Sequence, residues 1–205
     1  MWGSSDFYGE QPIMDEGEFI LVTLNYRLNM FGFLSTENEH IPGNMGLKDQ
    51  SLALKWIYEN IEIFGGNKSQ ILLSGWSAGG SSVSYHMVSE HTQSEWFTQA
   101  VSFSGSGLCP CHAYYKGEAL KNAQQLGRYV NCTGDGRDLK ICLQNQPAEE
   151  LMKHLSKFYK FSQHPFSVFS IVVEKPGTSS FLTLPIEEYF QKSKVKPKPW
   201  LITKV

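Results

Sequence analysis

The sequence has no long apolar run, no repeat and little net charge. Among its 205 residues the formal net charge is −2 and the pI is near 6.3. Such a weak field does not favour capture by nucleic acid or by an anionic membrane. The longest unbroken apolar run, Phe19 to Val22, is far shorter than the about 20 residues needed to cross a bilayer. Neither a nucleic-acid partner nor a transmembrane segment is expected.

Signals for targeting and for metal binding are also weak. Residues 1–10 (MWGSSDFYGE) have neither the basic start nor the apolar centre of a secretory signal. The donors in Cys109-Pro110-Cys111-His112 are too crowded to wrap a tetrahedral ion easily. No Gly-rich phosphate loop or metal-binding helix is present either. We therefore expect no metal site.

The apolar residues that are present predict an α/β fold. Hydrophobic residues make up 41% of the chain, enough for a real core within one domain. Buried strands are predicted at Phe19–Tyr26, Ile71–Leu73 and Ala100–Phe103, and helices at Leu47–Phe64 and from Ala78 onward. Strands that alternate with helices indicate a mostly parallel sheet with crossover helices.

Beyond Gly107 the pattern loosens and predicts a helical excursion away from the sheet. Helices are expected near Ala119–Val130 and Pro147–Leu155, with a polar loop containing Cys132 and Cys142 between them. The basic linker Lys192–Lys198 is interpreted as a solvated loop, and residues 199–205 (PWLITKV) as a strand that returns to the sheet.

One motif carries the chemistry. Gly75-Trp76-Ser77-Ala78-Gly79 fits Gly-x-Ser-x-Gly and stands between a predicted strand and a predicted helix. On such a sharp turn the serine is lifted clear of the sheet, and we expect a Cβ at either flanking glycine to collide with nearby backbone. The N–H of Ala78, at the helix start, is placed to donate to an oxyanion. A chance Gly/Ser turn is the alternative, but the flanking elements and Gly80 favour Ser77 as a nucleophile.

The sequence resembles the type-B carboxylesterase family over nearly its whole length. The matching stretches are Asn25-Tyr26-Arg27, residues 31–35 (FGFLS), residues 42–50 (PGNMGLKDQ), residues 64–67 (FGGN), the serine motif and Ser104-Gly105-Ser106. The resemblance implies an α/β-hydrolase fold and hydrolysis of carboxylic esters through an acyl-serine intermediate. It also implies small-molecule or lipid-like ester substrates held in an apolar gorge, with no cofactor.

The chain departs from the family pattern in three respects. Trp76 stands where the family normally has Glu, which changes the charge and hydration beside the nucleophile. The family's His-Gly-Gly-Gly oxyanion segment would precede Met1, and its triad acid and histidine would follow Val205. Residues 1–205 are thus interpreted as a partial domain, truncated at both ends and inactive as an isolated chain. None of the six histidines is expected to replace the base.

The resemblance also bears on compartment. Cys132 and Cys142 resemble a family disulfide, whereas the even cysteine count alone leaves two reduced thiols open. Asn67 and Asn131 begin glycosylation sequons. Together these features favour the secretory lumen or the outside of the cell. The alternative function is a non-catalytic, esterase-like binding or adhesion protein, although such relatives usually lose the serine.

Overall fold

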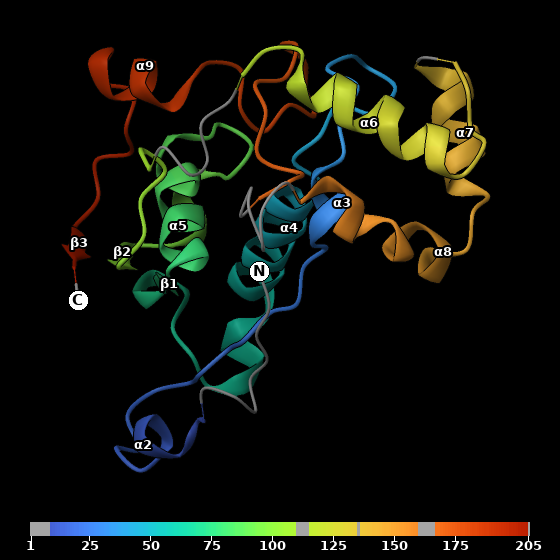
Figure 1. The fold of residues 1–205 in the computed structure, drawn as a ribbon. Coiled ribbons are helices and arrows are strands. Elements are labelled where there is room, and N and C mark those ends of the chain that lie inside the picture. Colours follow the sequence, from blue (N-terminus) through green and yellow to red (C-terminus); the bar gives the residue numbers. More distant parts are fainter. Residues whose placement is uncertain (1–8, 110–114, 135, 160–166, 205) are drawn as a thin grey trace.

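The computed structural model describes residues 9–109, 115–134, 136–159 and 167–204, and these contain a parallel sheet. Its strands are β1 (Leu72–Trp76), β2 (Gln99–Phe103) and β3 (Trp200–Thr203). β2 lies in the middle and pairs in parallel with both neighbours (Figure 1). The α/β class and these three strands are therefore predicted correctly.

Helices flank the sheet and extend away from it. They are α2 (Gln11–Met14), α3 (Asn29–Phe33), α4 (Met45–Asn60), α5 (Ala78–Val88), α6 (Glu118–Tyr129), α7 (Arg137–Gln144), α8 (Ala148–Lys153) and α9 (Ile186–Gln191), with short 3-10 turns at Ile61–Phe64, Lys68–Gln70, Ser94–Trp96 and Leu155–Phe158. After the Ile61–Phe64 turn, Gly65 adopts the left-handed conformation expected of a helix stop. The predicted helices at residues 47–64, 119–130 and 147–155 are confirmed to within a few residues.

The strand predicted at Phe19–Tyr26 is wrong. Residues 19–28 form neither helix nor strand, and Phe19, Ile20, Leu21 and Val22 are exposed. A parallel strand forms only where a neighbour offers backbone partners along its edge. In the described part of the chain β1 pairs only with β2, so no strand stands beside this apolar run.

Within the described residues, helices and loops cover only one face of the sheet. α5 packs against β1 and β2, where Val83 and Met87 enclose Ala100. Side chains alternate along a strand, so every second residue points to the opposite face. There Leu72, Trp76, Phe103 and Leu201 are exposed, and the apolar face they form is called the open sheet face below.

The helices after Gly107 form a layer of their own. α6, α7 and α8 lie on the opposite side of the molecule from the sheet (Figure 1). Their buried residues form one cluster with the α3 region, including Met30, Leu126, Leu139, Leu143 and Leu151. The predicted excursion is confirmed.

The predicted polar loop between Cys132 and Cys142 is wrong in part, because α7 occupies most of it. Leu139 and Leu143, four residues apart, are both buried and give α7 its inner face. The glycines at positions 134 and 136 obscure this short pattern in the sequence.

A buried carboxylate ties the segment after residue 167 to the start of α4. The side chain of Glu174 accepts hydrogen bonds from Asn44 Nδ2 (2.7 Å) and the Phe181 N–H (3.0 Å), and it pairs with Lys48 Nζ at 2.5 Å. Asn44 also donates to and accepts from the backbone of Val172. The contacts of Glu174 with Asn44 and Lys48 connect residues about 130 positions apart in the sequence.

Candidate active site

Ser77 sits on a strained turn between β1 and α5. Its backbone angles, φ 55° and ψ −115°, are rare for a residue with a side chain. The Ser77 N–H donates to the carbonyl of Phe103 at 2.8 Å, which anchors the turn to β2. The backbone is thus held in the conformation that projects a side chain from the end of a strand.

Two glycines allow this turn to close. A Cβ on Gly75 would lie 2.3 Å from the carbonyl carbon of Gly79. One on Gly105 would lie 1.9 Å from the carbonyl oxygen of Ser77. Both contacts are with backbone, which cannot rotate away as a side chain can. In the sequence Gly105 stands only within a matching motif, and its position after β2 explains its role.

The expectation for Gly79 is wrong. A Cβ on Gly79 would meet no atom within 4 Å, and its φ is not positive. Of the two glycines that flank Ser77 in the motif, only Gly75 is required by the packing described here.

The Ser77 side chain is partly exposed, and no hydrogen bond of its Oγ occurs within the described ranges. Ala78 is the first residue of α5, so its N–H lies among the donors at a helix start that have no intrahelical acceptor. The positive end of the helix dipole adds a favourable potential for an anion at this point. A partly exposed hydroxyl therefore lies next to a backbone N–H donor at the start of a helix.

No described histidine reaches Ser77. His86 and His91 pack beside Phe181, His154 stacks on Tyr129, and His40 lies near Glu39. His112 and His164 lie outside the described residues. Within the described residues, Ser77 therefore has no histidine base.

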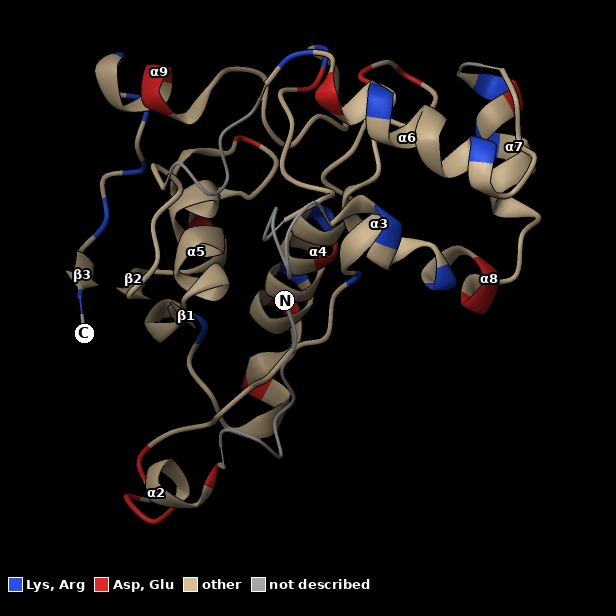
Figure 2. Cartoon of the chain, in the orientation of Figure 1, with Lys and Arg blue, Asp and Glu red and all other residues tan. Residues whose placement is uncertain are grey.

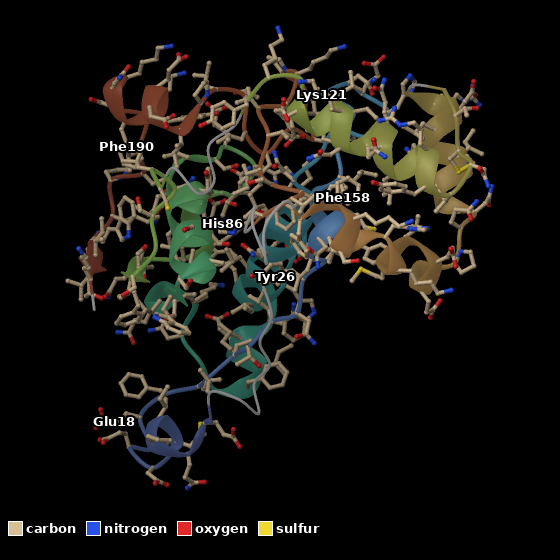
Figure 3. The ribbon with its side chains drawn as sticks, in the orientation of Figure 1. Glu18, Tyr26, His86, Lys121, Phe158 and Phe190 are labelled. Atoms are coloured by element: carbon tan, nitrogen blue, oxygen red, sulfur yellow. A yellow bond between two sulfur atoms is a disulfide. The ribbon has the colours of Figure 1, made fainter. Side chains whose placement is uncertain are left out.

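His86 is instead the centre of a buried polar network between α4 and α5. Its Nδ1 lies 2.7 Å from Thr92 Oγ1 and its Nε2 lies 2.8 Å from Gln50 Oε1. Thr92 also bonds to Ser51, while Gln50 donates to Ser82 on α5. Burial lowers the pKa of His86 to about 3, so the ring is neutral at physiological pH. Figure 3 shows His86 on α5.

The sequence does not predict this network or its neighbour Lys196. Ser82 and His86 are four residues apart on α5, which indicates a shared face, but nothing in the sequence pairs them with Gln50. Lys196, expected in a solvated loop, is partly buried and donates to the carbonyls of His86 (2.7 Å) and Ser89 (2.5 Å) at the end of α5. Burial lowers the pKa of its amine to about 8.

A small pocket lies beside the turn. Ala78, Ser81 and Ser82 from α5 line it together with Phe33 and Leu47, among others. Its volume is about 60 Å³, well below the roughly 300–1,000 Å³ of typical ligand pockets. It gives the first turn of α5 open space but does not enclose an ester.

The remaining predicted site residues lie on the surface or in a disulfide. Trp76 is exposed on the open sheet face. Cys132 and Cys142 form a disulfide, which confirms the pairing implied by the family resemblance. Asn67 and Asn131 are both exposed. Cys109 is disulfide-bonded, so it offers no thiolate to a metal.

Other classes of site find no support in the described ranges. No cluster of three potential metal ligands occurs there. None of the helices seen combines the length and apolar character required to span a membrane. Positive and negative side chains are interspersed over the elements (Figure 2).

Comparison with known proteins extends the resemblance to the whole chain. A model of the carboxylesterase family matches residues 1–205. Esterase-5A of Drosophila pseudoobscura pseudoobscura is 41% identical over 99% of the chain. Venom carboxylesterase-6 of Apis mellifera is 38% identical over 98%, and juvenile hormone esterase of Tribolium castaneum is 37% identical over 99%. The chain spans 35–37% of the length of these relatives. On this match, and on the strand-turn-helix geometry around Ser77, the chain belongs to the carboxylesterase family.

Proposed function

We propose that this chain is the nucleophile-bearing part of a longer serine carboxylesterase. The observation that carries the proposal is the backbone of Ser77, which is held at φ 55° between a strand and a helix by close backbone packing at Gly75 and Gly105. A turn of this kind exposes a serine at the top of a sheet. Membership of the carboxylesterase family supports ester hydrolysis as the chemistry of this serine.

In the proposed reaction, Ser77 Oγ attacks the ester carbonyl carbon. A general base removes the hydroxyl proton as the new C–O bond forms, and the carbonyl electron pair becomes an oxyanion. The Ala78 N–H donates to that oxyanion. Collapse of the intermediate expels the alcohol, which takes up the proton, and water then releases the acid from Ser77. The base, its carboxylate partner and further oxyanion donors would come from outside residues 1–205.

The proposed substrates are small-molecule or lipid-like carboxylic esters. Relatives named as a venom carboxylesterase and a juvenile hormone esterase support this class without fixing one ester. Trp76 would place an indole where the family normally places a carboxylate, so we propose that it removes negative charge next to the acyl site.

We also propose that the protein enters the secretory pathway. The Cys132–Cys142 disulfide supports an oxidising compartment, as does similarity to a protein named for venom. The sequons at Asn67 and Asn131 are exposed and thus accessible to a glycan.

Extending the coding sequence at both ends and assaying the product tests the function. The proposal expects an upstream Gly-rich oxyanion segment, a downstream acid and a downstream histidine. It also expects hydrolysis of p-nitrophenyl esters that Ser77→Ala reduces by at least a thousandfold. A full-length protein without the histidine and without hydrolysis would favour the binding or adhesion alternative.

A further inference from the structure

A second and larger pocket lies between the α3 region and the helices α6, α7 and α8. Its volume is about 390 Å³, within the range of ligand pockets. It shares no lining residue with the pocket beside Ala78. α3 contributes to both, because Asn29 and Phe33 line the small pocket while Met30 and Phe31 line the large one.

The floor of the large pocket is apolar. Its lining includes six core residues that are themselves buried, namely Met30, Leu34, Ile41, Leu126, Leu143 and Leu151. These residues belong to one hydrophobic cluster, so the pocket opens directly onto the core of the helical layer. Such a floor favours an alkyl chain, since removing each CH₂ group from water is favourable.

The described lining is basic and contains no carboxylate. Its ionisable side chains are Arg27, His40 and Lys140. Arg27 is neutralised by Asp49, which it contacts at 2.7 and 2.6 Å. Lys140, on α7, forms no ion pair within the described residues. Its ammonium group is therefore available to a ligand, and Figure 2 shows the basic residues of α7.

We propose that this pocket binds a medium-chain fatty acid, with the alkyl chain on the apolar floor and the carboxylate at Lys140. The uncharged Gln144 and Gln146 side chains also line the pocket and supply further polar groups. The site does not include Ser77 and does not depend on ester hydrolysis. It is a binding site in addition to the proposed active site.

Photolabelling of the extended protein, which carries the flanking coding sequence, tests the proposal. Decanoic acid with a terminal diazirine is the probe, and labelled peptides are mapped by mass spectrometry. Unlabelled decanoate and decyltrimethylammonium serve as competitors with the same chain and opposite charge. Ala148→Phe fills the pocket from its exposed edge, and Lys140→Gln removes the ammonium. Lys194→Gln is the matched control, because Lys194 is exposed, lacks an ion pair in the described ranges and follows α9, away from α7 (Figure 1).

The proposal predicts labels on the peptides that contain Leu126 and residues 140–151. Decanoate competes at lower concentrations than decyltrimethylammonium does. Ala148→Phe weakens labelling at least tenfold, and Lys140→Gln weakens the apparent affinity about two- to fivefold, as expected for an exposed ion pair. Lys194→Gln leaves labelling unchanged. Labels confined to the open sheet face, equal competition by the ammonium compound, or labelling that survives Ala148→Phe would each overturn the proposal.

Discussion

The glycines around Ser77 differ in how much space surrounds them for an added side chain. Gly105→Ala would place a Cβ against the Ser77 carbonyl, and backbone must shift to admit it. We expect the free energy of unfolding to fall by about 3 kcal/mol, the upper range for overpacking. Urea unfolding of dilute protein measures this loss.

Gly79→Ala is the matched control. The added methyl group meets open space in a helix, where alanine is preferred over glycine. Its unfolding midpoint should match that of the unmodified chain or exceed it slightly. Equal losses in the two variants would show that the close packing at Gly105 is not as described.

The buried ring of His86 gives a pH dependence with a definite sign. Its pKa is about 3 in the folded chain and about 6.5 when unfolded. The unfolded state therefore binds more protons between these values, and stability present above pH 6.5 is lost as the pH falls. The contribution is at most about 1.4 kcal/mol per pH unit.

Unfolding of the unmodified chain and of His86→Gln, measured between pH 7.5 and 5, tests this contribution. The groups that surround the ring are Gln50, Thr92, His91 and Lys196. Burial also lowers the pKa of His91, so part of the slope should remain in the variant. Identical slopes for the two proteins would mean that His86 is not held neutral by burial.

At the scale of elements, the sequence pattern predicts helices and strands that depend on nearby residues. It fails where an element needs a partner from a distant segment of the chain. α4, α5 and β1 follow from the spacing of apolar residues and from the Gly-x-Ser-x-Gly turn. The Phe19–Tyr26 run has equally good strand composition, but strand formation depends on a neighbour that composition cannot supply. The contact of Glu174 with Asn44 was equally out of reach, because no local pattern links residues so far apart.

The buried Glu174 side chain connects distant elements, so its loss should lower the free energy of unfolding. Glu174→Gln removes the charge opposite Lys48, whose side chain is 17% exposed. Breaking a buried pair in this way is expected to lower the free energy of unfolding by about 3 kcal/mol. Glu39→Gln breaks the exposed pair with Lys175 and should leave the urea midpoint almost unchanged. Similar urea midpoints for the two variants would show that the buried contacts of Glu174 do not stabilise the fold.

At the scale of the whole molecule, exposed apolar surface determines whether the chain associates in solution. The open sheet face and the Phe19–Val22 run both expose large apolar side chains. Such surfaces favour association. We expect the 205-residue chain to bind the dye ANS and to self-associate as its concentration rises. A chain that remains monomeric as its concentration rises and binds no dye would contradict this.

The central claim is that Ser77 is the nucleophile and that it needs groups beyond residues 1–205. A fluorophosphonate probe, with the adduct located by peptide mass spectrometry, tests it most directly. The account predicts an adduct on Ser77 in the extended protein and none in Ser77→Ala. In the 205-residue chain it predicts labelling no greater than in the matching Ser77→Ala control. An adduct on another serine of the extended protein, or strong labelling of Ser77 in the isolated chain, would contradict the account.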